Sequence, residues 1–321
     1  MKRFIKSIFT FALLLIPTCF VYLFFWGFVP DKIKSNLNYG LGSGGYSYSR
    51  LQEVKNFKEV DILFLGSSRS YRGFDTRIFN QYGFYSFNLG SSSQTPLQTK
   101  VLLNRYLDRL NPKLIIYEVS PEIFYVDGVE SALDIISNDK NDRESIDMAL
   151  TINHIKVYNT LCYAIERDLL HLNVDFHQPL QDENDTYISG GYVERRQLDF
   201  SDNKDMADVE FVSNEKQTDA FHEIIRLFKR QGIDYLLVYT PVTDDYYENF
   251  PDNENFDDKM KTFGTYYNFN KILNLDDSLH FYDWDHLNQA GVEIFNRNLI
   301  EKIKPTQISC EKSTSGLPIQ K

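Results

Sequence analysis

Short apolar runs alternate with stretches of helical periodicity along most of the chain. Each run has the composition of a strand buried on both faces and is bounded by Gly, Pro or polar residues. The strands predicted in this way cover residues 60–65, 85–89, 114–117, 235–239 and 280–283. Helices are predicted at residues 95–110, 222–229 and 288–303. Strands that alternate with helices predict a parallel sheet covered by helices on both faces.

One long segment interrupts this alternation. Residues 123–215 are polar and acidic, with helical character near 158–172. We interpret them as an insertion into an α/β domain that spans residues 58–304, and we expect the insertion to lie over the edge of the sheet where the strands end. The tail at 305–321 is expected to be flexible.

The N-terminus has a different pattern. Basic residues lie within the first six positions, and an apolar run without charge follows at 8–29. A helix of roughly 20 apolar residues crosses a bilayer core. The positive flank should stay in the cytoplasm, which would place everything after Pro30 outside. We therefore predict a single-pass anchor at residues 1–30 that contacts membrane lipid through 8–29.

Two other interpretations of this run stay open. One is a cleaved signal peptide, although no small-x-small cleavage site follows the run. The other is a lipoprotein signal that ends at Cys19, where Thr18 is a poor preceding residue. Residues 31–57 are rich in Gly, Ser and Tyr, and we expect them to form a linker that lifts the domain off the membrane.

Composition excludes several classes of function. The 321 residues carry a formal net charge of -11 and no basic stripe, so we expect no nucleic-acid partner. The three cysteines are too few for a disulfide scaffold, and only Cys162 and Cys310 could pair outside the membrane. No zinc-type Cys/His spacing occurs, so we expect neither a metal nor a cofactor.

Polar clusters follow each of the predicted strands. In parallel α/β sheets, ligands bind at the carboxyl ends of the strands. The clusters lie at positions 67–68, 90–93, 118–122, 240–243 and 283–286. Their shared position at one rim predicts a functional site there.

Two of these clusters carry residues suited to nucleophilic catalysis. A serine needs a base to remove its proton, and the base is usually a histidine held by a carboxylate. Asp283 lies three residues before His286 at a predicted strand-to-helix turn, and of the six histidines only His286 is predicted to lie at such a turn. Ser68 follows the first predicted strand. The pattern indicates a Ser68–His286–Asp283 triad.

These segments resemble the SGNH/GDSL hydrolase superfamily. Gly66-Ser-Ser68 is similar to its first block, and Asp283-x-x-His286-Leu-Asn-x-x-Gly to its last. Segments 88–95 and 112–122 resemble the second and third blocks. The resemblance covers roughly residues 58–122 and 231–303 and implies a three-layer α/β/α, flavodoxin-like fold.

The chain departs from the family pattern at three positions. Ser67 replaces the Asp that precedes the nucleophile. Ser93 stands where a glycine lends its N–H to the oxyanion, and a backbone N–H survives that change. Glu122 replaces the asparagine of the third block, and an ionised carboxylate cannot donate. The resemblance therefore implies that the N–H groups of Ser68 and Ser93 serve as oxyanion donors.

Charged residues near the nucleophile leave alternatives open. Arg69 and Arg72 either pair with Glu118 or Glu122, bind an anionic substrate group, or lie on a helix surface. Glu122 either holds a proton and donates a hydrogen bond, or pairs with one of these arginines.

The resemblance implies a serine esterase or O-acyltransferase outside the cytoplasm, at the periplasmic or cell-surface side. The expected substrate is an acyl ester of an envelope glycan or polymer, and a membrane-bound acyltransferase is an expected partner. Hydrolysis and transfer share one acyl-enzyme, so the sequence does not separate them. The alternative is a non-catalytic glycan-binding or scaffold protein on the same fold, a pseudoenzyme, which Glu122 favours.

Overall fold

A five-stranded parallel sheet forms the centre of the molecule. A computed structural model of the chain describes residues 1–30, 32–196, 200–201, 212–250 and 252–303. The strand order is β2-β1-β3-β6-β7. Their bounds are β1 (Ile62–Leu65), β2 (Ser86–Asn88), β3 (Leu114–Glu118), β6 (Asp234–Tyr239) and β7 (Thr265–Asn268).

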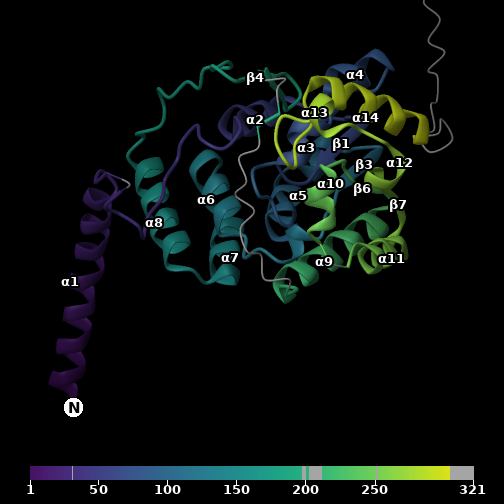
Figure 1. Cartoon of the computed structure of the whole chain (residues 1–321). Coiled ribbons are helices and arrows are strands. Elements are labelled where there is room, and N and C mark those ends of the chain that lie inside the picture. Colours follow the sequence, from purple (N-terminus) through teal and green to yellow (C-terminus); the bar gives the residue numbers. More distant parts are fainter. Residues whose placement is uncertain (31, 197–199, 202–211, 251, 304–321) are drawn as a thin grey trace, which may run out of the picture.

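Alternate side chains of each central strand enter different cores. Leu63 and Leu65 of β1 pack on one face, whereas Ile62 and Phe64 pack on the other. This follows from the period of two along a strand. The first face is covered by α5 (Pro96–Leu110), α9 (Glu215–Gln231) and α11 (Asn253–Phe263). The second is covered by α4 (Thr76–Gln81), α12 (Phe269–Ile272) and α14 (Gln289–Lys302), and α3 (Ser68–Gly73) packs against α14. The predicted three-layer α/β/α class is confirmed (Figure 1).

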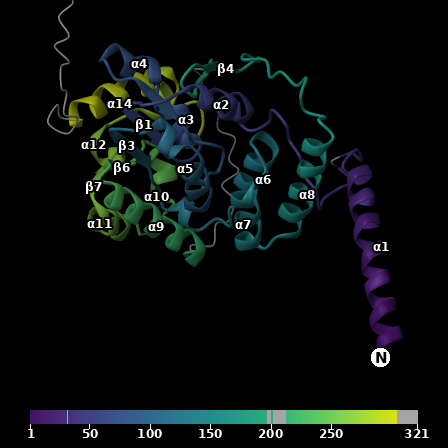
Figure 2. The ribbon, with the colours of Figure 1, turned by 180° about the vertical axis from the view of Figure 1, so that it is seen from behind.

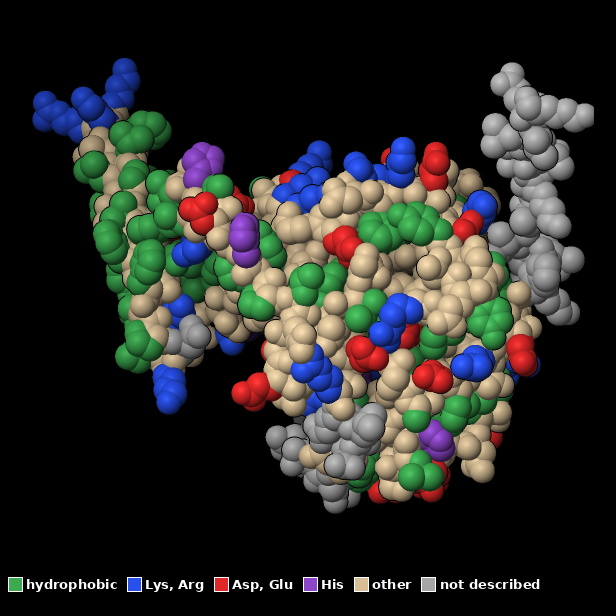
Figure 3. Space-filling model, turned by 90° about the horizontal axis from the view of Figure 1, so that it is seen from above, with side chains coloured by type: hydrophobic (Ala, Val, Ile, Leu, Met, Phe, Trp, Pro, Cys, Tyr) green, Lys and Arg blue, Asp and Glu red, His purple; other side chains and the backbone are tan. Residues whose placement is uncertain are grey.

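The N-terminal helix α1 (Lys2–Trp26) lies outside these layers (Figure 2). It is long and apolar enough to cross a membrane, with a mean hydropathy of 2.4 over 18 residues and no buried residue. Hydrophobic side chains cover its length, and the basic residues of the helix lie at its N-terminal end (Figure 3). Its C-terminal end packs on Tyr163, whose ring centroid is 6.3 Å from those of Phe24 and Phe28.

The stretch predicted as a linker is bound to the domain. The N–H of Asn38 donates to Thr160 Oγ1 (3.0 Å), and the N–H of Gly40 donates to Ser137 Oγ (3.1 Å). The stretch also contains α2 (Ser47–Glu53) and the 3-10 helix η1 (Val54–Asn56), which bury Leu51 and Val54 in the core. Its Gly/Ser/Tyr content predicted a spacer. The structure differs because composition does not reveal these long-range hydrogen bonds.

The insertion at 123–215 has two structural parts. Its helices α6 (Val129–Asn138), α7 (Arg143–Ile152) and α8 (Ile155–Leu169) extend the α5 layer sideways towards α1 (Figure 1). The antiparallel pair β4 (Asp185–Ile188) and β5 (Tyr192–Arg195) lies beside α3. At its turn, Gly190 O accepts from the N–H of Asn88 in β2 (2.8 Å). The hairpin therefore reaches the edge of the sheet where the strands end, and α6 reaches the loop after β2, where Ser131 Oγ lies 3.4 Å from Ser91 Oγ.

The prediction of a strand at 280–283 is wrong. These positions hold the end of α13 (Asp277–His280) and a loop closed by an isolated bridge between Phe281 and Leu287. The fifth strand is β7, whose aromatic and partly exposed residues lack the aliphatic pattern of a buried strand. Two more short helices, η2 (Glu122–Phe124) and α10 (Asp244–Glu248), follow β3 and β6. The predicted tail at 305–321, with Cys310, lies outside the described residues.

Candidate active site

A tight turn joins β1 to α3 and presents Ser68. Gly66 adopts φ +134°, and a Cβ there would meet the Cβ and Oε2 of Glu118 at 2.6 Å. Glycine is therefore required for the close approach of the two chains. Ser67 is the N-cap of α3, with its Oγ accepting the N–H of Arg69 (3.3 Å). Ser68 is the first residue of α3, so its N–H has no acceptor within the helix.

The carboxylate of Glu118 accepts two hydrogen bonds from this turn. Its Oε2 accepts the N–H of Ser67 at 2.8 Å and the hydroxyl of Ser67 at 2.9 Å. The side chain is fully buried at the end of β3. Burial raises the pKa of Glu118, against the opposing effects of Arg69 and the Ser67 hydrogen bonds.

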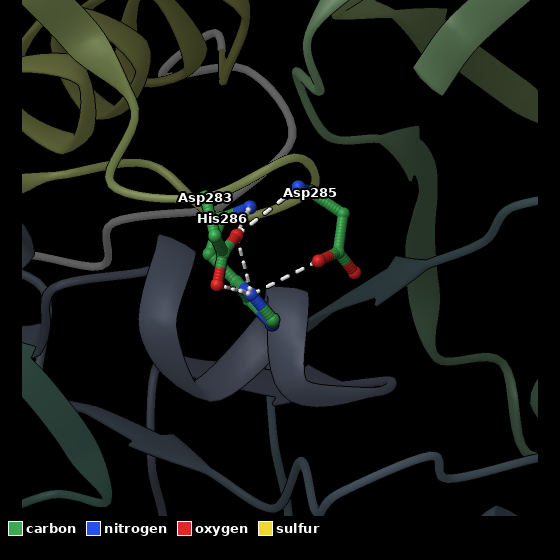
Figure 4. A group of neighbouring side chains, drawn as sticks. All are labelled: Asp283, Asp285 and His286. Carbon is green, nitrogen blue, oxygen red and sulfur yellow. Dashed lines mark hydrogen bonds and ion pairs between the residues drawn. The ribbon is translucent and has the colours of Figure 1, made fainter. Parts of the chain in front are cut away.

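The loop between Phe281 and Leu287 presents the histidine. Trp284 O accepts the N–H (3.1 Å) and the hydroxyl (2.8 Å) of Thr243, which fixes the loop to the end of β6. Asp283 Oδ1 accepts the N–H groups of Asp285 (3.1 Å) and His286 (2.8 Å). These bonds orient the Asp283 carboxylate towards the imidazole (Figure 4).

The structure brings Ser68, His286 and Asp283 together. His286 Nε2 lies 2.8 Å from Ser68 Oγ, and Nδ1 lies 3.0 Å from each carboxylate oxygen of Asp283. One ring nitrogen therefore faces the hydroxyl, and the other faces a carboxylate. This is the arrangement in which imidazole can take a hydroxyl proton while a carboxylate holds its orientation.

A second carboxylate, which the sequence analysis missed, also contacts the ring. Asp285 Oδ1 lies 3.1 Å from His286 Nδ1 (Figure 4). Burial acts to lower the pKa of His286, but Asp285 and Asp283 outweigh it and raise the pKa to about 10. Burial acts to raise the pKa of Asp285, but His286 and Arg69 hold it below its usual range. The available signal was that Asp285 directly precedes the histidine of the motif.

Arg69 lies beneath the site and not on a helix surface. Its side chain is 3% exposed, and its NH2 donates to Ser120 Oγ (2.7 Å) and Glu122 Oε2 (2.9 Å). Glu118 Oε1 lies 3.5 Å from its Nε. The same oxygen of Glu122 accepts the hydroxyl of Tyr246 (2.8 Å). Of the two alternatives for Glu122, the observed geometry is the ion pair.

Arg72 has a different partner from either predicted glutamate. Its guanidinium forms two hydrogen bonds, of 3.0 and 2.8 Å, to Asp185 in β4. It also lies 5.8 Å from the ring centroid of Tyr282, which stacks on His286 at 5.6 Å and 4°. Tyr282 and Asp185 had no motif to mark them, because their positions depend on the docking of the inserted hairpin.

The loop after β2 lies beside the turn between β1 and α3. The N–H of Ser91 donates to Gly66 O (3.3 Å), and a Cβ at Gly90 would meet Ser67 O at 2.9 Å. Ser93 lies two residues further on, exposed and in the left-handed conformation with φ 50°. Both backbone segments expected to supply oxyanion donors are thus on the same rim as Ser68.

The ring and its two aspartates also have the spacing of a metal site. Ligand atoms of Asp283, Asp285 and His286 lie within 4.8 Å of one another. A metal would need the lone pair of Nδ1, which here faces carboxylates at hydrogen-bond distance. Asp283 is also engaged by two backbone N–H groups. The observed contacts are those of an imidazole hydrogen-bonded to two carboxylates.

Comparisons with known proteins give little further information. The chain matches no protein-family model and no curated protein. Among solved structures, it is similar to the crystal structure of a Bacteroides fragilis protein proposed to be an acylhydrolase. The match covers 80% of this chain and 95% of the other, with a TM-score of 0.42 and 11% identity. These values are too low to transfer an activity to this chain.

Proposed function

We propose that the protein is a membrane-anchored serine esterase or O-acyltransferase. The observation that carries this proposal is the 2.8 Å contact of His286 Nε2 with Ser68 Oγ, with Asp283 on the opposite ring nitrogen. A serine, a base and an orienting carboxylate in this order are suited to acyl transfer.

The reaction would proceed through an acyl-enzyme. Once His286 is neutral, Ser68 Oγ attacks the ester carbonyl carbon while its proton passes to His286 Nε2. The tetrahedral intermediate then expels the alcohol, which takes that proton. A water or an acceptor hydroxyl next attacks acyl-Ser68, giving the free acid in hydrolysis or a new ester in transfer.

Oxyanion stabilisation would come from backbone donors. Arg69 donates through NH2 to Glu122 and Ser120, and its Nε and NH1 atoms are buried; Glu122 accepts from Arg69 and Tyr246. Neither side chain is therefore free to serve the oxyanion. The N–H groups of Ser68 and Ser93 are the proposed donors, and loss of one such donor costs about 10²–10³ in rate.

The proposed substrate is an acyl ester of an envelope glycan or polymer, and the proposed partner is a membrane-bound acyltransferase. Both follow from the resemblance in sequence and from the anchor α1, whose basic N-terminal residues favour a cytoplasmic N-terminus. Protease added to spheroplasts should digest the domain. Protection of the domain would contradict the proposed extracytoplasmic location.

Ester-release and transfer assays test the activity. The full chain in detergent would be incubated with acylated envelope polymer, with Ser68→Ala as the inactive control. Acid release indicates hydrolysis, whereas acyl groups on a second polymer indicate transfer. Equal rates for wild type and Ser68→Ala would refute the proposal.

A non-catalytic glycan-binding or scaffold role is the second candidate. One feature favours it: Asp285 and Asp283 lie 3.1 and 3.0 Å from Nδ1 and raise the pKa of His286 to about 10, which favours a protonated imidazole that cannot act as a base at neutral pH. A serine-reactive fluorophosphonate probe discriminates the two. Failure of the probe to label wild type at any pH up to about 10, together with glycan binding, would support the second role.

A further inference from the structure

The carboxylate of Asp285 lies between the proposed base and a buried arginine. Its Oδ1 is 3.1 Å from His286 Nδ1, and its Oδ2 is 3.8 Å from Arg69 NH1. Arg69 directly follows Ser68 on α3, whereas Asp285 directly precedes His286 on the catalytic loop. Asp285 therefore connects the element that carries the nucleophile with the element that carries the base.

The proposed triad carboxylate is heavily engaged elsewhere. Asp283 Oδ1 receives two backbone N–H groups in addition to facing Nδ1. Those bonds shape the loop but do not link it to α3. Asp285 makes the contact that reaches across, and Arg69 itself is anchored to Glu122 and Ser120 on the β3 side.

We propose that Asp285 is a positioning residue that ties His286 to the buried Arg69 and thereby holds the imidazole against Ser68. This inference rests on the proposed function. A residue outside the triad would then control the position of the imidazole. That position matters because a misplacement of about 1 Å can cost 10²-fold in rate.

The charges around the imidazole agree with this role. Asp283 and Asp285 face Nδ1 from the loop, and Ser68 faces Nε2 from α3. Tyr282 stacks on the ring, and the guanidiniums of Arg72 and Arg195 lie 5.8 and 5.0 Å from the Tyr282 centroid. Arg69 does not contact the ring directly, and its NH1 lies 3.8 Å from Asp285 Oδ2. Two carboxylates on one ring nitrogen favour the imidazolium, which forms when Ser68 gives up its proton.

The test compares wild type with Asp285→Asn, which keeps shape and removes charge. Full-length protein in detergent would be assayed with p-nitrophenyl acetate as a function of pH. We expect the plateau kcat to fall about 10-fold or more, with KM changed less than about twofold, because the base is misaligned while binding is not. The rate rises with pH as His286 loses its proton. The midpoint of this rising limb should move to lower pH by about one unit or more, because a carboxylate that favours the charged ring is gone.

Asp258→Asn is the matched control. Asp258 is 77% exposed on α11 and pairs with Lys261, so its substitution makes the same change in net charge away from the site. Its kinetics and pH limb should equal those of wild type. If the midpoint of the rising limb in Asp285→Asn stays within about 0.3 pH unit of wild type, the proposal is overturned. A lower kcat alone would not rescue it, because a general weakening of the fold would also lower kcat.

A second measurement works without activity. The protein would be labelled with 13Cε1-histidine, and the His286 signal assigned by its loss in His286→Gln. The NMR titration midpoint of His286 should fall by about one pH unit or more in Asp285→Asn and stay unchanged in Asp258→Asn. If wild type hydrolyses no ester, the proposed function fails, and this titration still decides whether Asp285 acts on His286. An unchanged midpoint would reject the inference even if the enzyme is active.

Discussion

His286 Nε2 and Ser68 Oγ lie 2.8 Å apart although 218 positions separate the two residues in the chain. The contact joins the first helix after β1 to the loop before α14. It exists because β1 and β6 lie in one parallel sheet, with β3 between them, so that their carboxyl ends open onto the same rim.

The identity of the nucleophile can be tested by labelling with a fluorophosphonate. Ser68→Ala should lose labelling completely, because its hydroxyl is the one facing His286. Ser67→Ala should still label, since the Ser67 hydroxyl is bound to Glu118 (2.9 Å). Labelling that vanishes in Ser67→Ala and persists in Ser68→Ala would move the assignment by one residue.

The rate of labelling should depend steeply on pH. A His286 pKa of about 10 leaves only a small neutral fraction at neutral pH. The rate should therefore rise about 10-fold per pH unit from neutrality and level off near pH 10. Labelling reactions stopped after fixed times, at a series of pH values over this range, measure this rise. A profile that is already flat from about pH 7 would show that the base is neutral there.

Stability should depend on the same ionisation. The pKa of His286 is raised from 6.5 in the unfolded chain to about 10 in the folded one. Its contribution to stability is therefore full below about pH 6.5 and is lost as pH rises through about 10. Urea denaturation of wild type and His286→Gln measures this. The difference between their free energies of unfolding should be larger near pH 6 and smaller near pH 10.5, about the two ends of that window. A difference that grows with pH would contradict the sign.

Glu122→Gln should weaken the fold without raising the rate. Arg69 would lose its 2.9 Å counter-charge but keep Glu118, and Glu122 is partly exposed. We expect the free energy of unfolding to fall by about 1 kcal/mol. Chemical denaturation measures this, with exposed Glu301→Gln as the control. A rise in the labelling rate would instead indicate that residue 122 donates a hydrogen bond to the oxyanion.

Glu118→Gln should be more damaging than Glu122→Gln. Glu118 is fully buried, and its carboxylate accepts two hydrogen bonds from Ser67 and neutralises Arg69. Breaking a buried ion pair by neutralising one partner costs about 3 kcal/mol. The nucleophile turn should also loosen, so fluorophosphonate labelling should slow. Unfolding and labelling rates equal to those of the Glu301→Gln control would show that Glu118 does not hold the turn.

The missed and misplaced features share a cause. Phe281 and Tyr282 are buried and apolar, as a strand would be, but they belong to a loop closed by a bridge between Phe281 and Leu287. Strand β7 forms at the sheet edge from residues that are only partly buried. A run of apolar residues does not distinguish a strand from a compact loop, because both bury apolar side chains.

The sequence by itself determined what depends on short covalent spacing. Every residue of β1 is apolar, which predicted a strand buried on both faces, and the period of two along the strand sends Ile62 and Phe64 to one core and Leu63 and Leu65 to the other. The three-residue spacing of Asp283 and His286 likewise lets the loop set a carboxylate against a ring nitrogen, because both residues lie within one tight loop.

Only the tertiary structure decided which distant groups meet. It paired Arg69 with Glu122 and Arg72 with Asp185, and it placed Asp285 between His286 and Arg69. These contacts depend on how elements pack, and a buried charge takes whichever opposite charge the packing brings within reach. The spacing of residues along the chain contains no such information, because the partners lie on elements that only folding brings side by side.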